Sequence, residues 1–538
     1  MRWREVEIIF FTTSRPPSIL LLPMRNVSSS AISPTRQENF PEWYQQVVKH
    51  AQLAENSEVR GCMVIKPWGY ALWERMQSIL DQMFKATGHR NAYFPLFIPL
   101  SHLQKEAEHV EGFAKECAVV THHRLEMKEG KLIPAAELTE PLLIRPTSET
   151  IIGSTYAKWI KSYRDLPILL NQWANVVRWE LRPRLFLRTA EFLWQEGHTA
   201  HESEQEALEE TERMHEIYRT FLQDYLAVPA FSGEKTASER FPGALRTYTL
   251  EAMMQDGKAL QATTSHFLGQ NFAKAFGIQF QSRSGTLEHA WTTSWGATTR
   301  LIGMLLMIHG DDDGAILPPR IAPSQVVIIP FIPKAEEKKN ILQKAEEIAQ
   351  LLRQTEYARE PIRVEIDTRD LGGSIKNWDW IKRGVPLRLE IGPRDLVKNM
   401  VMVGRRDHPP KEKEPLLLSE LQERLPLLLA DMEQGLWQRA LSYQKARTYE
   451  INTQEEFYDF FRNSGVSFSP HGEDDLTPSK LSGFALAHWN GSAAIEAKLK
   501  EDLQVTIRCI PHQDDPITGI CPFSGDSSPQ RVLFARSY

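Results

Sequence analysis

The stretch from residue 178 to residue 198 constrains the fold more than any other part of the sequence. Arg178-Trp179-Glu180 follows an apparent strand, a Pro/Arg turn comes next, and alternating polar and aromatic residues lead from Arg188 to His198. This pattern predicts an antiparallel hairpin whose arms present alternate side chains on one face. On that face Arg178 and Arg188 could clamp a polyanion, because the planar guanidinium forms paired hydrogen bonds with phosphate.

Two further side chains of this hairpin suit a nucleotide. Phe192 could stack on a base, and Glu180 could accept a hydrogen bond from an exocyclic amine. A plain solvated hairpin would not explain why arginines and carboxylates alternate with aromatic residues. We therefore expect a nucleotide site here.

A second anion-binding feature comes later in the chain. Gly296–Arg300 opens an apolar helix over residues 301–308 that ends at Gly310. A helix N-terminus carries free N–H groups and partial positive charge, so it favours an anion. The run Asp311-Asp312-Asp313 raises the alternative of a metal site, but the glycines on either side favour a helix exit.

Composition excludes several classes of protein. The 538 residues are 42% hydrophobic and 25% charged, which is ordinary for a globular protein with buried cores. No run of uncharged apolar residues is long enough for a membrane helix. Four cysteines cannot form a disulfide framework, which favours a reducing compartment, the cytoplasm. The net charge of −6 means that a nucleic-acid partner needs a local basic surface.

Changes in pattern along the chain divide it into modules. Residues 1–38 differ from the rest and are expected to be disordered or to follow a misassigned start. Prolines near residue 320 mark a boundary, and strands alternate with a helix beyond it. We expect three domains, over residues 39–320, 321–435 and 436–538.

Three motifs in order resemble those of the class II aminoacyl-tRNA synthetases. The expected helix 70–88 with Tyr93-Phe94-Pro95 is similar to motif 1, the dimer-forming element. Arg178–Phe192 is similar to motif 2, and Gly296–Arg300 with its helix to motif 3. Each motif alone is weak evidence, but the ordered set is specific.

Other segments resemble one subfamily, the prolyl-tRNA synthetases of the archaeal/eukaryotic-like type (class IIa). Thr147-Ser148-Glu149 is similar to the Thr-x-Glu loop of that subfamily, and Phe186–His198 to the return arm of its motif 2. Gln261 and Thr264-Ser265-His266 resemble its strand for ATP and proline.

The resemblance implies a multidomain α/β fold. Its parts would be an antiparallel-sheet catalytic core with flanking helices, an α/β anticodon-binding domain and a small C-terminal α/β domain. It also implies that Arg178 and Arg300 are catalytic, and that Gln261 lies near the magnesium ion that accompanies ATP. The implied ATP-binding residues are Arg178, Glu180, Arg188, Thr189, Phe192, Gln261, Thr264 and Arg300. The implied proline-binding residues are Thr147, Glu149, Arg178, Trp194, Glu196, His198, His266 and Ser294.

The two later modules fit the resemblance unequally. Residues 361–412 hold more Lys and Arg than Asp and Glu, a modest patch for tRNA. On or beside its strands, four residues could read unstacked anticodon bases or be ordinary surface charges: Asp367, Lys376, Arg388 and Glu390. In the C-terminal module, relatives carry four zinc-binding cysteines, but here Cys521 alone remains, with Asn490, Ile495 and Ser524 at the other positions. We expect no structural zinc, because one thiolate cannot close a tetrahedral site.

The implied function is that of a homodimeric cytoplasmic proline–tRNA ligase without a membrane segment. Its partners would be ATP with Mg²⁺, L-proline and tRNA(Pro). Two alternatives stay open. One is a class IIa synthetase of other specificity, and the other is a catalytically idle paralogue that binds tRNA or senses an amino acid.

Overall fold

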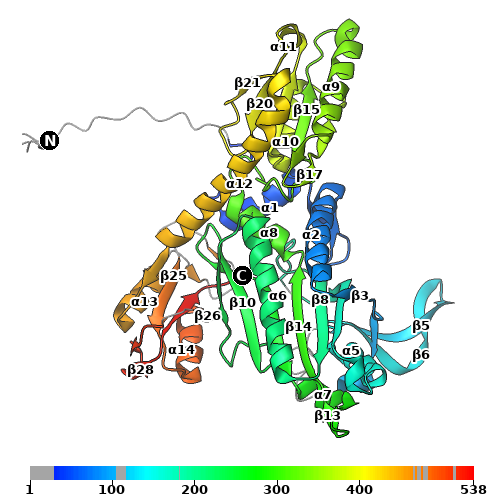
Figure 1. The fold of residues 1–538 in the computed structure, drawn as a ribbon, viewed down its shortest axis with the longest axis vertical. Coiled ribbons are helices and arrows are strands. Elements are labelled where there is room, and N and C mark those ends of the chain that lie inside the picture. Colours follow the sequence, from blue (N-terminus) through cyan, green and yellow to red (C-terminus); the bar gives the residue numbers. More distant parts are fainter. Residues whose placement is uncertain are drawn as a thin grey trace, which may run out of the picture.

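A long helix, α12 (Leu421–Ala446), connects an upper lobe to a larger body (Figure 1). The computed structural model describes residues 30–104, 117–180, 182–463, 467–468, 474–475, 483–512 and 516–538. The domain boundary expected between residues 435 and 436 lies inside α12, the helix that connects the two parts.

The body is built on one sheet that extends through the catalytic and C-terminal regions. Its order is β22-β25-β29-β26-β9-β10-β11-β14-β8-β7-β3. Neighbours are antiparallel except for the outermost pairs β22–β25 and β3–β7. The strands are β3 (Arg90–Asn91), β7 (Ile168–Val177), β8 (Glu191–His201), β9 (Ala230–Glu234), β10 (Arg246–Met253), β11 (Ala259–Gly269), β14 (Trp291–Thr298), β22 (Thr448–Glu450), β25 (Phe484–His488), β26 (Thr506–Pro511) and β29 (Arg531–Ala535).

Helices cover this sheet and bury the largest hydrophobic core. In α6 and α2 apolar residues recur at helical spacing, and this stripe packs inward. The helices of the body are α1 (Phe40–His50), α2 (Pro67–Ala86), α3 (Leu100–Gln104), α5 (Glu149–Trp159), α6 (Glu204–Asp224), α7 (Asn271–Phe276), α8 (Arg300–His309), α13 (Gln454–Asn463) and α14 (Ala493–Leu503). The predicted helices at 70–88 and 301–308 are thus present with shifted ends.

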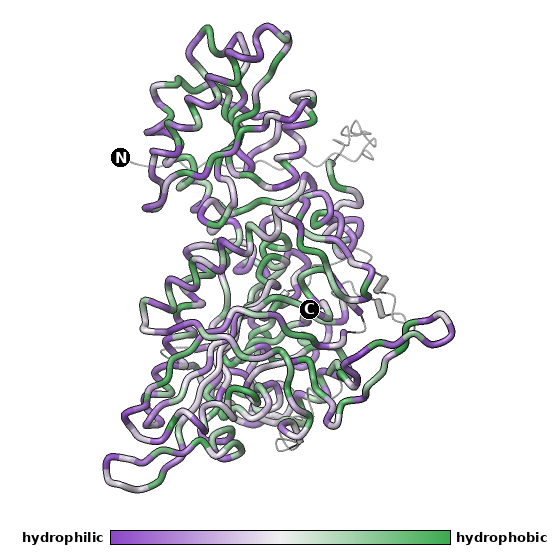
Figure 2. Tube along the Cα trace, turned by 90° about the vertical axis from the view of Figure 1, so that its right-hand side faces the viewer, coloured by the Kyte–Doolittle hydropathy of each residue, from purple (hydrophilic) through white to green (hydrophobic). Residues whose placement is uncertain are grey.

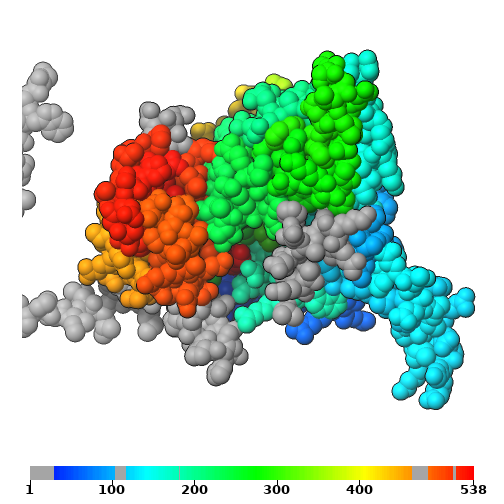
Figure 3. Space-filling model, turned by 90° about the horizontal axis from the view of Figure 1, so that it is seen from below, coloured from blue at the N-terminus to red at the C-terminus, as the bar shows by residue number. Residues whose placement is uncertain are grey.

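Further strands lie outside the large sheet of the body. A hairpin of β5 and β6 projects away from it, and Figure 3 shows this hairpin in cyan, standing clear of the main mass. The bounds are β1 (Ala54–Asn56), β2 (Met63–Ile65), β4 (Phe97–Pro99), β5 (Val119–Lys128), β6 (Lys131–Ile144), β12 (Gln279–Gln281), β13 (Leu287–His289), β23 (Ser467–Phe468), β24 (Asp474–Asp475), β27 (Gly519–Ile520) and β28 (Ser527–Ser528).

The upper lobe is a separate α/β unit. Its sheet has the order β18-β15-β19-β20-β21, in which the three strands β18, β15 and β19 are parallel. Apolar stretches run through its interior and polar residues lie on its outer turns (Figure 2). The bounds are β15 (Val326–Pro330), α9 (Lys338–Arg353), β16 (Glu356–Tyr357), β17 (Glu360–Pro361), β18 (Val364–Ile366), α10 (Gly373–Arg383), β19 (Leu387–Ile391), α11 (Pro393–Val397), β20 (Met400–Arg405) and β21 (Glu414–Leu417). The expected fold class is confirmed.

The expected N-terminal extension differs from the structure at its end. Residues 1–29 lie outside the described residues, but Ile32 is fully buried in the main core. Its backbone N–H donates to the carbonyl of Asp312 at 2.9 Å. The expectation of disorder is therefore wrong for residues 30–38, of which Ile32 and Arg36 bond to the chain at the end of α8.

The Asp311–Asp313 run binds arginines and connects the two lobes. Arg406 of the upper lobe donates to both carboxylate oxygens of Asp311, at 2.5 and 2.8 Å. Asp312 pairs with Arg36 at 3.2 Å. In the part of the chain that the structure describes, no group of three or more His, Cys, Asp or Glu side chains could hold a metal. These carboxylates thus serve contacts between segments.

Gly197 tests how closely the central sheet packs. A Cβ atom on Gly197 would lie 2.0 Å from the indole of Trp295, a fully buried residue on the neighbouring strand β14. Gly197→Ala should therefore lower the free energy of unfolding by about 1–3 kcal/mol, as overpacking does. Urea unfolding followed by circular dichroism measures the change.

Gly435 provides the matched control. It lies inside α12 with nothing within 4 Å of an added Cβ. Gly435→Ala should leave the protein as stable or up to about 1 kcal/mol more stable, because alanine loses less backbone entropy. Equal unfolding midpoints for Gly197→Ala and wild type would contradict the packing argument.

Candidate active site

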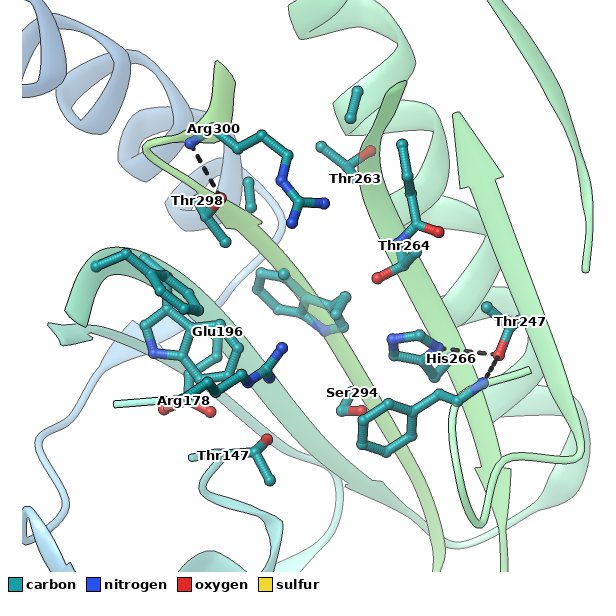
Figure 4. A pocket seen from close by; sticks show the side chains of 18 of the residues that line it. Thr147, Arg178, Glu196, Thr247, Thr263, Thr264, His266, Ser294, Thr298 and Arg300 are labelled. Carbon is teal, nitrogen blue, oxygen red and sulfur yellow. Dashed lines mark hydrogen bonds between the residues drawn. The ribbon is translucent and has the colours of Figure 1, made fainter. Parts of the chain in front are cut away.

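A cavity of about 370 Å³ lies in front of strands β8, β11 and β14. Its wall includes every residue predicted above for ATP and proline, drawn from distant parts of the sequence. Figure 4 shows Arg178 and Arg300 pointing into this cavity from different elements. The predicted residues that line it are Thr147, Glu149, Arg178, Glu180, Arg188, Thr189, Phe192, Trp194, Glu196, His198, Gln261, Thr264, His266, Ser294 and Arg300.

The alternation of β8 supplies one side of the cavity. Phe192, Trp194, Glu196 and His198 all line it, as residues two apart on a strand share a face. Across the sheet, Ser294 of β14 lies opposite His198 in the register. The spacing of this segment in the sequence thus indicates which of its side chains share a face.

A bulge in β11 brings three polar side chains to the same cavity. The register with β10 shifts at Leu250/Glu251, so that β11 carries one extra residue. In a regular strand Gln261 and Thr264 would face opposite sides, but here both line the cavity together with His266. Ser265 faces the other way and donates to the carbonyl of Thr211 on α6 at 2.7 Å.

The hairpin of motif 2 differs from the expectation in one respect. Its arms are β7 and β8, whereas Arg178 and Arg188 lie in the connection between them and not on paired strands. The connection folds back on itself, because Arg184 and Arg188 form an isolated bridge and Phe186 adopts a positive φ of 62°. This loop structure brings both arginines to the cavity.

Three guanidinium groups concentrate positive charge in the cavity wall. The Nε atom of Arg178 donates to the carbonyl of Pro146 at 3.0 Å, and its guanidinium lies 5.7 Å from the ring of Phe192. Arg300, the first residue of α8, donates from Nε to the carbonyl of Leu187 at 3.2 Å. Burial and the charges of Arg178 and Arg188 lower the pKa of Arg300 to about 10. An anion bound here would relieve this mutual repulsion.

The opposite half of the cavity holds a buried carboxylate–imidazole pair. Glu196 accepts from Nε2 of His198 at 2.9 Å and from Ser148 and Gln172 at 2.5 and 2.7 Å. Burial opposes the ionisation of Glu196, but these hydrogen bonds and the charge of His198 outweigh it and lower its pKa. Burial likewise opposes the charge on His198, yet Glu196 and Glu149 raise its pKa. Both shifts favour an ion pair.

One segment of the cavity wall was not predicted from the sequence. Residues Glu239, Arg240 and Phe241, between β9 and β10, line the cavity. The ring of Phe241 stacks on His266 at a centroid distance of 4.6 Å, and Thr247 lies 3.0 Å from the Nδ1 atom of His266. Pro242 and Gly243 signal a loop in the sequence. Nothing in the sequence, however, indicates that this loop contacts β11.

Buried polar atoms in this wall remain available for a ligand. Within the described residues, Ser294 Oγ and Trp194 Nε1 are buried and have no hydrogen-bond partner in the protein. A buried polar group without a hydrogen bond lowers the stability of the folded protein, so the position of these atoms in the cavity wall fits a polar ligand.

Comparison with known families matches the three parts of the chain. Residues 131–309 match the class II tRNA synthetase core domain (G, H, P, S and T). Residues 325–426 match the anticodon binding domain, and residues 479–538 match the C-terminal domain of prolyl-tRNA synthetase.

Curated relatives match over nearly the whole chain. A proline–tRNA ligase 2 from Anaeromyxobacter dehalogenans is 60% identical over 95% of this chain and 99% of its own length. Proline–tRNA ligases from Protochlamydia amoebophila and Rhodopirellula baltica are each 56% identical, over 95% and 96% of this chain and 99% of their own lengths. The chain belongs to the proline–tRNA ligase family. The prediction of an aminoacyl-tRNA ligase is confirmed.

The residues expected to read the anticodon lie outside the cavity and differ from a base-reading surface. All four are buried in the upper lobe, beside α10. Asp367 accepts from Arg369 at 2.7 Å and from Trp380 at 2.8 Å, and Lys376 donates to the carbonyl of Asp367. The remaining pair has partners in the lobe too: Arg388 donates to Asn377, and Glu390 pairs with Lys413. Sequence position on a strand could not distinguish these internal bonds from surface exposure.

At the cysteine positions of the C-terminal domain, hydrogen bonds connect the same segments. Asn490 donates from Nδ2 to Ser524 Oγ at 3.1 Å and to Asp526 Oδ2 at 2.9 Å. Cys521 is buried, and Ile495 packs on the core of this domain. The absence of structural zinc stays a prediction. In the described portion of the chain, no helix is both long and apolar enough to span a bilayer.

The Glu196–His198 pair predicts a pH dependence of stability. The pKa of His198 is raised above 6.5, so the stabilisation by its charge is fully present below about pH 6.5 and declines as the pH rises through the folded pKa. The difference in melting temperature between wild type and His198→Gln should therefore shrink at high pH, as thermal unfolding at a series of pH values would measure.

His408→Gln is the control for this titration. His408 lies at the surface of the upper lobe, where its side chain is 41% exposed. Its replacement should change the melting temperature little at any pH, because exposed pairs contribute little. A pH-independent difference for His198→Gln would contradict the ion pair.

Proposed function

We propose that this chain activates L-proline with ATP and transfers the prolyl group to the 3′ end of tRNA(Pro). The single observation that supports this most strongly is the convergence of Arg178, Arg188 and Arg300 on one cavity that also contains a buried carboxylate. A triphosphate fits the cationic half, and an ammonium group fits the carboxylate half.

In the proposed reaction, the carboxylate of proline attacks the α-phosphorus of ATP in line, and pyrophosphate leaves. The protein needs little covalent chemistry for this step, since positioning and charge neutralisation carry it. Arg178 would hold the α-phosphate and the proline carboxylate, and Arg188 and Arg300 the γ-phosphate end. Phe192 would cover the adenine, Glu180 would accept its amine, and Thr189 and Thr264 would complete this half.

The other half would bind proline. The secondary ammonium needs acceptors, which Thr147, Glu149 and Glu196 provide, and the apolar ring needs a flat wall, which Trp194 provides. His198, His266 and Ser294 would complete the pocket. The pKa of His266 is lowered to about 3 by burial and by the charge of His198, so this ring is neutral and adds no repulsion toward the ammonium.

Magnesium would enter as the counter-ion of ATP. Gln261 lines the cavity and offers an amide oxygen, a donor type that Mg²⁺ accepts. The ion would supply further neutralisation of phosphate charge, while the arginines of the wall bind and orient the nucleotide.

The upper lobe would bind the anticodon stem of the tRNA. Asp367 holds Arg369, whose side chain is 37% exposed, at the carboxyl end of the parallel strands. We infer that Asp367 and Lys376 position this edge of the sheet and that the buried residues Arg388 and Glu390 stabilise it. Exposed groups such as Arg369 would contact the nucleic acid.

The subtype is proposed to be the archaeal/eukaryotic-like one. Between Thr189 and Thr299 the described chain contains only the strands and short helices of the core and α6, without a further inserted domain. We therefore expect no hydrolysis of alanyl-tRNA by this chain, as a deacylation assay on alanyl-tRNA(Pro) would measure. Cleavage of that substrate would contradict the expectation.

We also propose a homodimer in the cytoplasm. The edge strand β3 ends the large sheet. Tyr93 follows it closely in the chain and Trp159 contacts Phe94, and the two residues are 70% and 52% exposed. Such an edge with exposed aromatic residues suits a partner copy. All four cysteines are free, in keeping with a reducing compartment.

Amino-acid-dependent exchange of pyrophosphate into ATP tests the activity. Proline should stimulate exchange well above threonine, glycine, histidine or serine. Stimulation by another of these amino acids would favour a different specificity, and no stimulation by any would favour an idle paralogue that only binds tRNA or senses an amino acid.

Arg178→Ala tests the cationic half of the cavity. Exchange should fall by at least about 100-fold, since a preorganised contact to the transition state is removed. Arg182→Ala is the matched control, because Arg182 belongs to the same loop but is exposed and outside the cavity wall. Near-normal exchange in Arg178→Ala would count against the proposed role.

A further inference from the structure

The C-terminal domain packs directly against the β9 edge of the catalytic domain. Figure 3 shows its orange and red residues side by side with green residues of the catalytic domain. The contact is a strand pairing, because Ile510 of β26 lies opposite Glu234 of β9. A Cβ atom on Gly233 would lie 2.4 Å from the carbonyl of Ile510, so the two strands approach too closely there for a larger residue.

The segment that follows β9, the strand paired with β26, leads to the cavity. Residues 235–245 connect β9 to β10, and Glu239, Arg240 and Phe241 within them line the cavity wall. The backbone N–H of Phe241 donates to Thr247 at 3.2 Å, and Thr247 in turn contacts His266. The position of this segment therefore decides where Phe241 lies against the ring of His266.

A carboxylate of the C-terminal domain holds the first half of this segment. Glu496 on α14 is 5% exposed, and its two oxygens accept from two hydroxyl groups of the segment. Thr236 Oγ1 donates to one oxygen at 2.8 Å and Ser238 Oγ to the other at 2.5 Å. One turn further along α14, Lys500 lies 3.1 Å from Glu239. Both contacts lie within a few residues of the cavity wall.

The beginning of the segment is fixed by a second buried group. Lys235 donates to Glu251 at 2.6 Å and to the carbonyl of Arg508 at 2.7 Å. Arg508 donates to the other oxygen of Glu251 at 2.9 Å. Since this end is held independently, loss of the Glu496 contacts would loosen residues 236–239, just before Phe241, without detaching the whole C-terminal domain.

We propose that Glu496 is a positioning residue for amino acid binding. By accepting from Thr236 and Ser238, it fixes the segment that places Phe241 against His266 on the wall of the amino acid pocket. It acts through this segment and does not itself line the cavity. The inference rests on the proposed assignment of that pocket to proline.

The test compares Glu496→Ala, Glu496→Gln and Glu501→Ala in the full-length chain. Pyrophosphate exchange gives KM for proline and for ATP, and thermal unfolding is recorded in parallel. Glu496→Ala should raise KM for proline about tenfold and KM for ATP less than about twofold, since coupled buried contacts commonly contribute that much. Glu496→Gln retains one acceptor oxygen and should recover part of the loss. Glu501 is exposed on the same helix, and its replacement should change neither constant.

A double-variant cycle identifies the route of the effect. Removal of both hydroxyls in Thr236→Ala/Ser238→Ala should raise KM for proline to a similar degree, and the triple variant with Glu496→Ala should add little. Unchanged KM for proline in Glu496→Ala would overturn the inference, and so would equal losses for both substrates that follow the melting temperature. Failure of wild type to use proline would instead overturn the proposed function on which the inference rests.

Discussion

The mutual repulsion of three guanidinium groups around one cavity is the constraint on which the site depends. Arg178 and Arg188 come from the loop between β7 and β8, and Arg300 from the start of α8. Three guanidinium groups repel one another, but backbone carbonyls accept hydrogen bonds from Arg178 and Arg300 and hold these two side chains in place. The fold thereby maintains a positive electrostatic potential in the cavity, which a bound triphosphate would neutralise before the reaction begins.

The large sheet makes this arrangement rigid and extends it beyond the catalytic domain. Its strands carry the polar floor of the cavity, and the same sheet continues through β26 into the C-terminal domain. The buried cluster of Lys235, Glu251 and Arg508 lies at that junction. A domain none of whose described residues lines the cavity can therefore still contact the segment that carries Phe241.

Much of the site could be predicted from the sequence where the period of a strand decides which side chains share a face. The alternation from Phe192 to His198 is such a case. The bulge in β11 could not be predicted in this way, because it reverses the alternation at a point that the sequence does not mark. Only the resemblance of this strand to that of a known family placed Gln261 beside Thr264. The segment around Phe241 was missed, since its contact with His266 joins two loosely patterned stretches. The buried positions of Asp367 and Arg388 also depend on α10 covering the sheet.

The sequence by itself indicated the class of the fold, the family and the chemical types that line the cavity, because its motif residues resemble those of a known family and its local periodicity is typical of the strands that carry them. Tertiary structure alone decided that Arg300 feels the charges of Arg178 and Arg188, that residues 30–38 pack on the core, and that Glu496 reaches Thr236 across a domain junction. Such contacts join residues far apart in the chain. Their free energy depends on distance and burial, and neither quantity is encoded in a local pattern.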